Sequence, residues 1–473
     1  MGVDLCYVVS HGFAARMILH SDILPNLRKA GVSVALVVPN AEEANMQALA
    51  QRHGVSLVQA PVMHSKLRSE YEGLLRRYLF ENVLENPSLR SWHYRYLDEG
   101  GKTAAKVRLY LGLNKVSLRS PAIRRMLDSV ERRLFLDSPE VAQIIADLNP
   151  SVVVSTYPVA ILEACFLHEA RKAGCTTVSQ LLSWDNITSK GRFSVNADYY
   201  VTWGPIMSEE VKAYYGVPKN RIFECGVAHF DRHITLPSEK GVRETVGRLG
   251  LDPDKPYLFF GMSSPAITPY EIEVVEWLAR AVEDGVWGPD LQLVVRPHPQ
   301  NVTGYTSDPT WLPRLDGLKS TRVVIDYPSL ETSSLAWNMK ERDLPHLVNL
   351  LAGCAICLNS GSTLSIDAMI QDKPVVLTVF DGTQTLPWHA SIRRYRDVIH
   401  MNKLIALGGV TPVGSFEELE AAIRADLADP GRTAEARAHT RAQECGTCDG
   451  RASERIATAL ASILERVSTA ELA

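Results

Sequence analysis

The sequence lacks long hydrophobic runs and any marked excess of one charge. It contains no window of about 18 or more apolar residues, so we expect no helix that spans a membrane. Lys and Arg number 50 against 54 Asp and Glu, a formal net charge of −4, which argues against general nucleic-acid binding. The first residues, MGVDLCYVVSHGF, lack the basic region of a signal peptide, so we predict a cytoplasmic protein.

Cysteine is scarce, and so are the motifs of common cofactors. Eight cysteines in 473 residues do not suit a disulfide framework. Two Cys-x-x-Cys pairs, which begin at Cys354 and Cys445, have the spacing of zinc or redox sites, but we interpret the first pair as buried in an apolar strand. Neither a GxxxxGK[ST] motif nor a GxGxxG motif after a strand occurs, so the sequence supports neither a P-loop nor a Rossmann dinucleotide motif.

Apolar segments alternate with helical patterns along the chain, which is typical of parallel α/β structure. The apolar runs are continuous, so both faces of each sheet should be covered. The expected strands are residues 5–10, 32–39, 56–61, 151–158, 176–182, 198–204, 222–226, 257–263, 291–299, 321–328, 354–360 and 374–382. The expected helices include residues 13–30, 159–173, 270–284, 344–352 and 363–370.

The predicted fold class is α/β, with two Rossmann-like, doubly wound domains. We expect the N-terminal domain at residues 1–235, with a helical insertion at about 62–136, and the C-terminal domain at 250–430. Pro, Gly and charged residues indicate a linker at about 233–255, and residues 431–473 form a helical tail. Open parallel sheets bind ligands beyond the carboxyl ends of their strands, so we look for site residues there.

The segment 66–135, within the expected insertion, is strongly basic. It holds 15 Lys and Arg against eight Asp and Glu, a balance of +7. One interpretation is a solvated helical arm, and the other is a surface for an anionic acceptor or for anionic lipid headgroups. Aromatic residues are interleaved with the cations, namely Tyr78, Phe80, Trp92, Tyr94, Tyr96 and Tyr110.

Small polar residues end the expected strand 354–360 and open the next helix. Gly361 permits a close approach of the backbone, and the hydroxyl groups with free helix N–H groups favour a phosphate, although a Ser/Thr helix cap is the alternative. Asp367 suits a ribose or sugar hydroxyl, or it complements the helix dipole. The predicted residues of this donor-binding set are Ser360, Gly361, Ser362, Thr363 and Asp367.

Two other strand ends in the second half carry polar residues. Arg296 and His298 lie in the segment RPHP, where a guanidinium and an imidazole suit a phosphate or pyrophosphate, a structural turn being the alternative. Ser263 and Ser264 add hydroxyl groups near the same edge. We therefore place these four residues in the predicted donor site.

The first half offers two candidates for a general base. His11 directly follows the first strand and suits the removal of a proton from an acceptor hydroxyl, or it is a capping or packing residue. Asp185, in the segment SWDNITSKG, is the competing base, or a turn-forming residue. His298 is a further candidate for a catalytic residue.

These segments together resemble the GT-B-fold glycosyltransferases of bacterial and archaeal surface-polysaccharide synthesis, in the group often labelled CDP-glycerol glycerophosphotransferase-like. The order and spacing of the segments are similar across nearly all of the chain. The resemblance rests on SWDNITSKG (183–191), RPHP (296–299), NSGSTLSIDA (359–368), the block at 380–400 and DGRASERIA (449–457).

The resemblance implies that a nucleotide-activated donor, a substrate rather than a cofactor, binds the C-terminal domain and that a glycan or lipid-linked acceptor binds the N-terminal one. It implies a metal-independent reaction in which positive side chains and helix N–H groups stabilise the departing phosphate. It assigns the donor to Arg296, His298, Ser362, Thr363 and Asp367, with Asp381 and Arg394 nearby.

The expected activity is glycosyl transfer in capsule or lipopolysaccharide synthesis, at the inner face of the cytoplasmic membrane. One alternative is a CDP-alditol phosphotransferase, which shares RPHP and the Ser-Thr-x-x-x-Asp pattern. The other is a hydrolysing nucleotide-sugar 2-epimerase. Its strongest N-terminal signatures, Gly-Thr-Arg after the first strand and His-x-Glu-Ala-Gly, are absent from the sequence.

Overall fold

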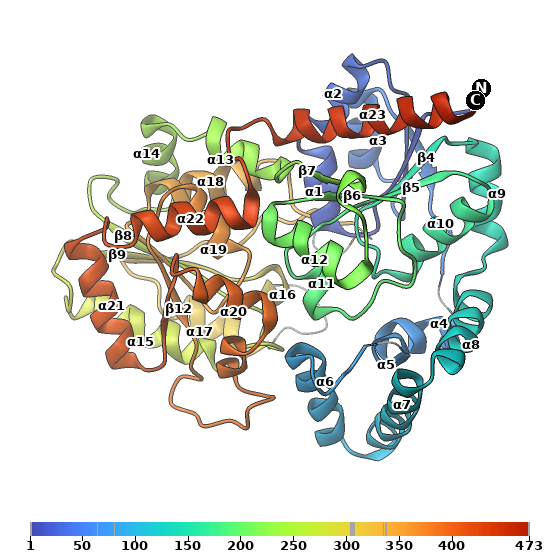
Figure 1. Ribbon diagram of the computed structural model, residues 1–473. Helices are drawn as coiled ribbons and strands as arrows, with labels where there is room; N and C mark the ends of the chain where they lie inside the picture. The colour runs from blue at the N-terminus through green and yellow to red at the C-terminus, as the bar shows by residue number, and fades with distance from the viewer. Residues whose placement is uncertain are drawn as a thin grey trace. The chain divides into compact units, whose positions relative to one another are not determined.

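The computed structural model describes residues 2–63, 65–79, 81–302, 308–333, 335 and 338–471, except for the side chains of residues 470 and 471. Phe80, one of the aromatic residues of the basic segment, lies outside these residues. The chain forms two compact units, traced by colour in Figure 1. Unit 1 comprises Met1–His229, Thr332–Asn338 and Glu444–Ala473, and unit 2 comprises Phe230–Glu331 and Met339–Gln443.

Unit 1 is built on a parallel sheet of seven strands in the order β3-β2-β1-β4-β5-β6-β7. Leu5 of β1 pairs with Val34 of β2 on one side and with Val152 of β4 on the other. Successive β1 residues enter different hydrophobic clusters, Tyr7 one and Cys6 the other, so helices cover both faces. The strands are β1 (Leu5–Val8), β2 (Val34–Val38), β3 (Ser56–Gln59), β4 (Val152–Ser155), β5 (Thr176–Gln180), β6 (Tyr199–Thr202) and β7 (Ile222–Glu224).

The helices of unit 1 begin and end at ordinary sequence signals. Ser138 caps the N-terminus of α9, where Pro139 takes the first position, and Asn149 ends α9 in the left-handed conformation. Outside the insertion, the α-helices are α1 (Gly12–Leu19), α2 (Ile23–Lys29), α3 (Ala44–His53), α9 (Pro139–Leu148), α10 (Ile161–Lys172), α11 (Asn186–Ser189), α12 (Pro205–Tyr215) and α23 (Ala452–Glu471).

The described residues of the insertion between β3 and α9 form helices joined by short non-helical segments, such as residues 81–86. Residues such as Tyr78 and Val107 give it a small hydrophobic core of its own. Its elements are α4 (Lys66–Glu70), the π-helix η1 (Tyr71–Leu75), α5 (Arg76–Leu79), α6 (Pro87–Asp98), α7 (Gly101–Arg119), α8 (Pro121–Glu131) and the π-helix η2 (Arg132–Leu136).

Unit 2 contains a parallel sheet of six strands in the order β10-β9-β8-β11-β12-β13. The strands are β8 (Tyr257–Gly261), β9 (Gln292–Arg296), β10 (Val323–Ile325), β11 (Ile356–Asn359), β12 (Val375–Thr378) and β13 (Thr411–Val413). The helices are α13 (Asp231–Thr235), α14 (Glu239–Arg248), α15 (Glu271–Glu283), α16 (Pro299–Val302), α17 (Trp311–Asp316), α18 (Asp343–Gly353), α19 (Leu364–Ile370), α20 (Ile399–Ala406), α21 (Phe416–Ala428) and α22 (Ala434–Cys445), whose last two residues are counted with unit 1.

Several elements differ from the sequence-based expectations. The helix expected at 13–30 is broken into α1 and α2, and the expected linker at 233–255 contains most of α13 and all of α14. The last helix, α23, belongs to unit 1, because Ile456, Leu460 and Ile463 on one face are buried in the unit 1 core. Within the described ranges, no helix combines the length and the hydropathy that crossing a bilayer requires.

Candidate functional site

Each sheet has one point at which the strand order reverses, and polar residues follow the strands on both sides of it. This point lies between β1 and β4 in unit 1 and between β8 and β11 in unit 2. Open α/β sheets bind ligands beyond the carboxyl ends of the strands at such a reversal. His11 follows β1, Ser263 follows β8 and Ser360 follows β11, so both reversal points are candidate sites.

A pocket of about 360 Å³ opens at the reversal point of unit 1. The ring of His11 lies there, with its centroid 5.3 Å from that of Phe13 and 5.7 Å from that of Tyr157. The positively charged Arg68 and the negatively charged Glu72 line the same pocket, so it contains both hydrogen-bond donors and acceptors. The polar residues lining it are Ser10, His11, Gln59, Arg68, Ser69, Glu72 and Tyr157.

Glu163, on α10, holds together the two loops at this reversal point. It is fully buried, and its carboxylate accepts the N–H groups of Ser10 (3.2 Å), Thr156 (2.6 Å) and Tyr157 (2.6 Å). Burial raises the pKa of Glu163, and these hydrogen bonds oppose the rise. Because one carboxylate binds both loops, it fixes the positions of Tyr157 and of the residues next to Ser10.

The ring of His11 accepts a hydrogen bond through Nδ1. The donor is the N–H of Phe13, at 3.2 Å, at the start of α1. Burial, and next the charge of Lys190, lower the pKa of His11 to about 4, so the ring is neutral at pH 7. A neutral ring that accepts at Nδ1 carries its proton on Nε2. His11 therefore presents an N–H donor at Nε2, and to act as a base it must first release the Phe13 N–H.

Asp185 follows β5 and begins α11. Its carboxylate lies 3.0 Å from Nζ of Lys190 and accepts the hydroxyl of Ser189 at 2.7 Å. The charges of Asp185 and Lys190 both act on Tyr157, so Asp185 lies near the same pocket. Asp185 therefore stays the competing candidate for the base, and its carboxylate is paired with Lys190.

Glu271, on α15, occupies the corresponding place in unit 2. It is 3% exposed and accepts the Ser263 N–H at 2.6 Å through Oε2 and the Ser360 hydroxyl through Oε1. It therefore ties the end of β8 to the end of β11. Burial raises the pKa of Glu271 to about 7, against the hydrogen bonds from Ser360, Ser263 and Thr268.

The turn after β11 is held from inside by Asn359. Its Oδ1 accepts the N–H groups of Gly361 (2.8 Å) and Ser362 (3.1 Å), so these two amides do not point outward as free donors. Gly361 has φ +94, and a Cβ there would lie 2.7 Å from Met401 and 2.8 Å from Tyr395. The Ser362 hydroxyl accepts the Leu364 N–H at 3.2 Å, and the side chains of Ser362 and Thr363 are half-buried, so their hydroxyl groups are the candidate donors of this turn.

Arg296, predicted to contact phosphates, has buried carboxylates as partners. Its Nη2 lies 2.7 Å from both carboxylate oxygens of Asp343, and its Nη1 binds Asp326. Asp326 in turn lies 2.8 Å from Nε2 of His346. The Arg296 side chain is 8% exposed. The two carboxylates outweigh the effect of burial and raise the pKa of Arg296, so the guanidinium is an internal cation of unit 2.

His298 and Asp367 also have partners inside unit 2. Nδ1 of His298 accepts the Gln300 N–H at 3.1 Å, and burial lowers the pKa of His298 to about 4. One carboxylate oxygen of Asp367 lies 3.0 Å from Nε2 of His233, on α13. The Asp367 carboxylate, predicted to bind a ribose or sugar hydroxyl, thus faces a buried imidazole of the same unit without the geometry of a hydrogen bond.

Asp381 and Arg394 shape the loop that covers the turn after β11. Asp381 accepts the Ile392 N–H at 3.0 Å and the Ser391 hydroxyl. Arg394 donates to the Ile267 carbonyl at 3.2 Å, and burial lowers its pKa. Because Tyr395 follows Arg394 and reaches Gly361, these contacts place the loop against the turn.

Among the described residues, one group of side chains has ligand atoms close enough to hold a metal ion, formed by Asp137, His168 and Glu169. Nζ of Lys172 lies 3.0 Å from Asp137 and 2.9 Å from Glu169, so an ammonium already neutralises these carboxylates. Cys354, from the first Cys-x-x-Cys pair, is a buried thiol whose pKa is raised by burial. Neither set favours a metal centre.

The two glutamates that brace the reversal points, Glu163 and Glu271, were not predicted from the sequence. Glu163 stands as a single acid in the apolar stretch ILEACF, which is a usable signal for a buried, hydrogen-bonded carboxylate. Glu271 lies in the first turn of α15, where an acid is explained equally well by the helix dipole. The structure brings Ser263 and Ser360 together through Glu271, and Gly361 and Ser362 together through Asn359.

Comparison with known proteins identifies the fold. No protein-family model matches the chain, and no curated protein matches its sequence. A protein of Listeria monocytogenes titled a UDP-N-acetylglucosamine 2-epimerase has a similar structure, with a TM-score of 0.59 and 12% identity over 99% of this chain and 98% of that one.

Two further solved structures are similar over almost their full length. S. aureus MnaA, solved with UDP, has a TM-score of 0.57 and 12% identity over 98% of this chain and 97% of its own. The Neisseria meningitidis UDP-GlcNAc 2-epimerase, bound to UDP-GlcNAc, has a TM-score of 0.56 and 11% identity over 98% and 100%. The predicted fold class is thereby confirmed: the chain has a GT-B-like fold with two Rossmann-like parallel sheets.

Proposed function

We propose that the chain is a metal-independent glycosyltransferase that moves a sugar from a nucleotide-activated donor to a polysaccharide or lipid-linked glycan. The observation that carries the proposal is the pair of braced reversal points, in which a buried glutamate ties together the polar strand ends of each sheet. The structures of similar fold that hold UDP and UDP-GlcNAc support nucleotide-sugar binding.

The donor nucleotide belongs in unit 2 on this proposal. Its phosphates meet the hydroxyl groups of Ser362 and Thr363, with Ser263 and Ser264 beside them on the end of β8. The acceptor hydroxyl belongs in unit 1, in the pocket of His11, whose Nε2 proton suits a hydrogen bond to a sugar oxygen. Asp185 is the competing base for that hydroxyl.

A second candidate function is hydrolytic epimerisation of a nucleotide sugar at C2. Two of the similar structures reported above favour it, since the Listeria and Neisseria proteins carry that title. Against it, Ser10-His11-Gly12 follows β1 where the sequence signature of such epimerases has Gly-Thr-Arg. We therefore rank transfer first.

The test begins with a thermal-shift screen over UDP-, GDP-, CDP-, CMP- and dTDP-linked sugars. A ligand at about 100 times its Kd stabilises the native state by about 2.7 kcal/mol. The chemical identity of the product then distinguishes the candidate reactions. Sugar joined to a glycan acceptor supports transfer, whereas a free 2-epimer released with UDP in the absence of acceptor overturns it, and a phosphate-linked product indicates an alditol phosphotransferase.

Matched variants locate the donor. Replacing Ser362 by Ala and Thr363 by Val removes two hydroxyl groups, each worth roughly 1 kcal/mol, so the Kd of the donor should rise by at least tenfold. The control is Thr321→Val, which removes an exposed hydroxyl near the opposite, amino end of β10 and should leave the Kd unchanged. An unaltered Kd in the double variant would refute this placement.

A further inference from the structure

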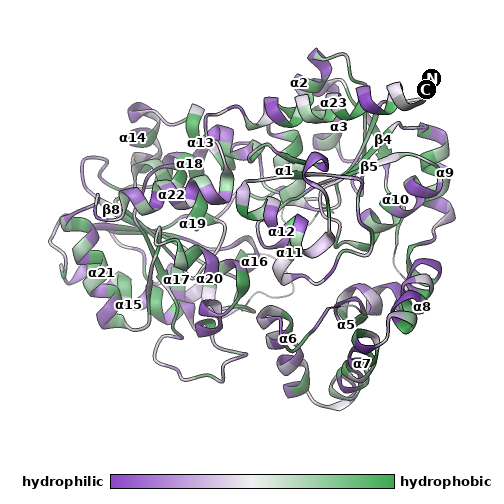
Figure 2. Ribbon diagram, viewed as in Figure 1, coloured by the Kyte–Doolittle hydropathy of each residue, from purple (hydrophilic) through white to green (hydrophobic). Residues whose placement is uncertain are grey.

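We propose that the helices α7 and α8 of the insertion bind an anionic lipid surface. This inference is independent of the reaction proposed above, because it concerns only the outer face of the insertion. The two helices are separated from α2 and α3 within unit 1, as Figure 1 shows. Their turns alternate between hydrophilic and hydrophobic residues in Figure 2.

The charge of α7 is of one sign. Its 19 residues, GKTAAKVRLYLGLNKVSLR, include five Lys and Arg and no acid. Lys106 pairs with Glu70, at 2.6 Å. Arg108, Lys115 and Arg119 are exposed and form no ion pair with any described residue. These three cations are therefore available to an anionic partner.

An apolar stripe runs along the exposed face of the same helix. Leu109 is 70% exposed and Val116 is 48% exposed, and with Ala105 and Gly112 they follow the spacing that puts side chains on one face. Lys102 and Lys106 flank the stripe on one side, and Arg108, Lys115 and Arg119 flank it on the other.

The opposite face of α7 is already fixed to the insertion. Nδ2 of Asn114 donates to the carbonyl groups of Tyr78 (2.8 Å) and Glu81 (2.7 Å), and the Ser117 hydroxyl donates to the Leu79 carbonyl at 2.8 Å. The helix therefore cannot turn to bury Leu109 without breaking these bonds.

The pattern continues in α8. Met126 is 57% exposed, Val130 is 40% exposed, and Leu134 in the following turn is 55% exposed, each four residues after the last. Arg125 and Arg133 are exposed beside them. Of the eleven large hydrophobic side chains that are exposed among the described residues, nine lie between Val62 and Leu134. Six of these nine lie on α7, α8 and the following π-helix η2, and exposed apolar side chains that gather in this way favour an interaction surface.

An anionic lipid surface is the occupant that fits both features. A second copy of α7 would bring cations against cations, and a nucleic acid would leave the leucine and valine exposed to water. At a bilayer, the apolar side chains enter the boundary of headgroups and acyl chains, while the flanking Lys and Arg contact anionic headgroups.

The experiment is co-sedimentation of the full chain with vesicles of phosphatidylcholine alone or mixed with phosphatidylglycerol. Wild type should bind only the mixed vesicles, and weakly at 1 M salt, because the Debye length falls from about 10 Å at 0.1 M to about 3 Å. Each Lys or Arg near such a surface strengthens binding roughly fivefold. The triple variant Arg108→Gln, Lys115→Gln, Arg119→Gln should therefore bind roughly a hundredfold more weakly.

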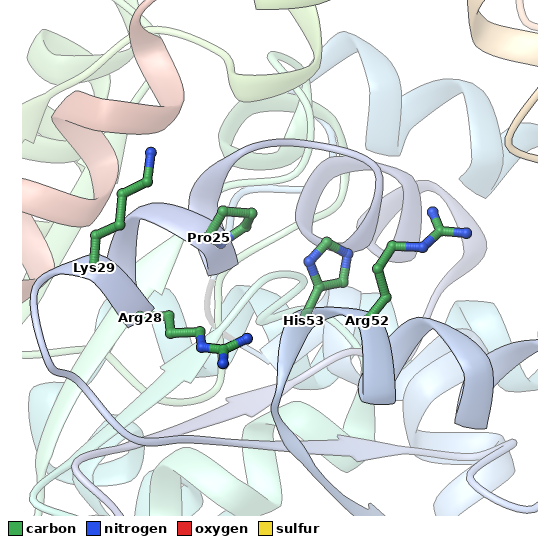
Figure 3. A pocket seen from close by; sticks show the side chains of 5 residues that line it. All are labelled: Pro25, Arg28, Lys29, Arg52 and His53. Atoms are coloured by element: carbon green, nitrogen blue, oxygen red, sulfur yellow. The ribbon is translucent and has the colours of Figure 1, made fainter.

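A charge-matched control comes from another surface of unit 1. Arg28, Lys29 and Arg52 line an open pocket between α2 and α3, together with Pro25 and His53 (Figure 3). They lie in the last turns of the two helices, where cations complement the helix dipole. Replacing all three by Gln removes the same charge as the α7 variant and should leave vesicle binding unchanged.

The apolar part of the surface has its own pair of variants. Leu109→Gln with Val116→Gln should weaken binding to mixed vesicles, whereas Tyr214→Gln with Ile234→Gln, exposed elsewhere, should not. The proposal is overturned by failure of wild type to bind mixed vesicles, by equal binding to both vesicle types, or by equal losses in the α7 variants and their controls. Concentration-dependent dimerisation that the α7 variants abolish, without vesicle binding, would assign the face to a second copy instead.

Discussion

The replacement Glu271→Gln tests how the ends of β8 and β11 are held together. The carboxyl group has an ordinary pKa of 4.5, and burial raises the pKa of Glu271 to about 7 in the folded chain. The native state therefore binds a proton more tightly than the unfolded state does. The contribution of Glu271 to the free energy of unfolding is therefore greatest below pH 4.5. It decreases by about 3 kcal/mol as the pH rises through about 7.

Glutamine imitates the protonated acid at this place. Its oxygen can accept the Ser263 N–H, and its amide can donate to Ser360, whose hydroxyl lies 2.9 Å from that of Thr378 and can donate there instead. The variant should thus fold and lose the pH dependence. We expect urea unfolding of wild type to show a free energy of unfolding that declines between pH 4.5 and 7.5 more steeply than that of the variant. Parallel curves for the two proteins would refute the reasoning.

The remaining predictions concern the two candidate bases and the glycine after β11. Replacing His11 by Ala should lower kcat by about 10²–10⁴-fold with donor affinity unchanged if His11 is the base, and Asp185→Asn should do so instead if Asp185 is. Because the pKa of His11 is about 4, its neutral form prevails above that pH, so a rate governed by His11 should be flat from pH 5 to 8 rather than rising near pH 6.5. Gly361→Ala should destabilise unit 2 by about 1–3 kcal/mol, since it forces a Cβ into positive φ and against Met401, whereas Gly112→Ala, in open space on α7, should stabilise slightly in the same thermal assay.

Much of the fold could be predicted from the sequence because parallel strands are buried on both faces and therefore appear as continuous apolar runs. The predicted strand 5–10 is Leu5–Val8 in the structure, since Ser10 and its neighbours leave the sheet to form the site. The edge strand β13 (Thr411–Val413) was missed because it is short and contains Pro412. The break between α1 and α2 falls at His20-Ser21-Asp22, a polar signal that the predicted helix 13–30 overlooked.

The location of the candidate site could also be predicted, but the contacts within it could not. Polar residues after strands 354–360 and 257–263 had to meet at one sheet edge, and Glu271 does join them there. The pairing of one side chain with another over long sequence separations leaves no periodic signal. The sequence therefore does not reveal the hydrogen-bond partners of Glu163 and Glu271, although each glutamate determines the geometry of a whole reversal point.

Arg296 shows this limit most clearly. A guanidinium at a strand end suits a phosphate, and the same guanidinium suits two carboxylates that arrive from elsewhere in the chain. Asp326 lies just beyond β10, and Asp343 begins α18, and neither stands out in the sequence. Removing Arg296 should therefore act first on folding: it leaves two buried carboxylates without their cation, and losing one partner of a buried ion pair costs roughly 3–5 kcal/mol.

The decisive comparison is between Arg296→Ala and the triple variant Arg296→Ala, Asp326→Asn, Asp343→Asn. The single variant should unfold at much lower urea, and the triple variant should recover part of the loss because no uncompensated charge remains. If the guanidinium served the donor alone, the single variant would keep wild-type stability and bind the nucleotide at least tenfold more weakly. Recovery of stability in the triple variant with unchanged nucleotide affinity would assign Arg296 wholly to the architecture of unit 2, which is what its contacts with Asp326 and Asp343 lead us to expect.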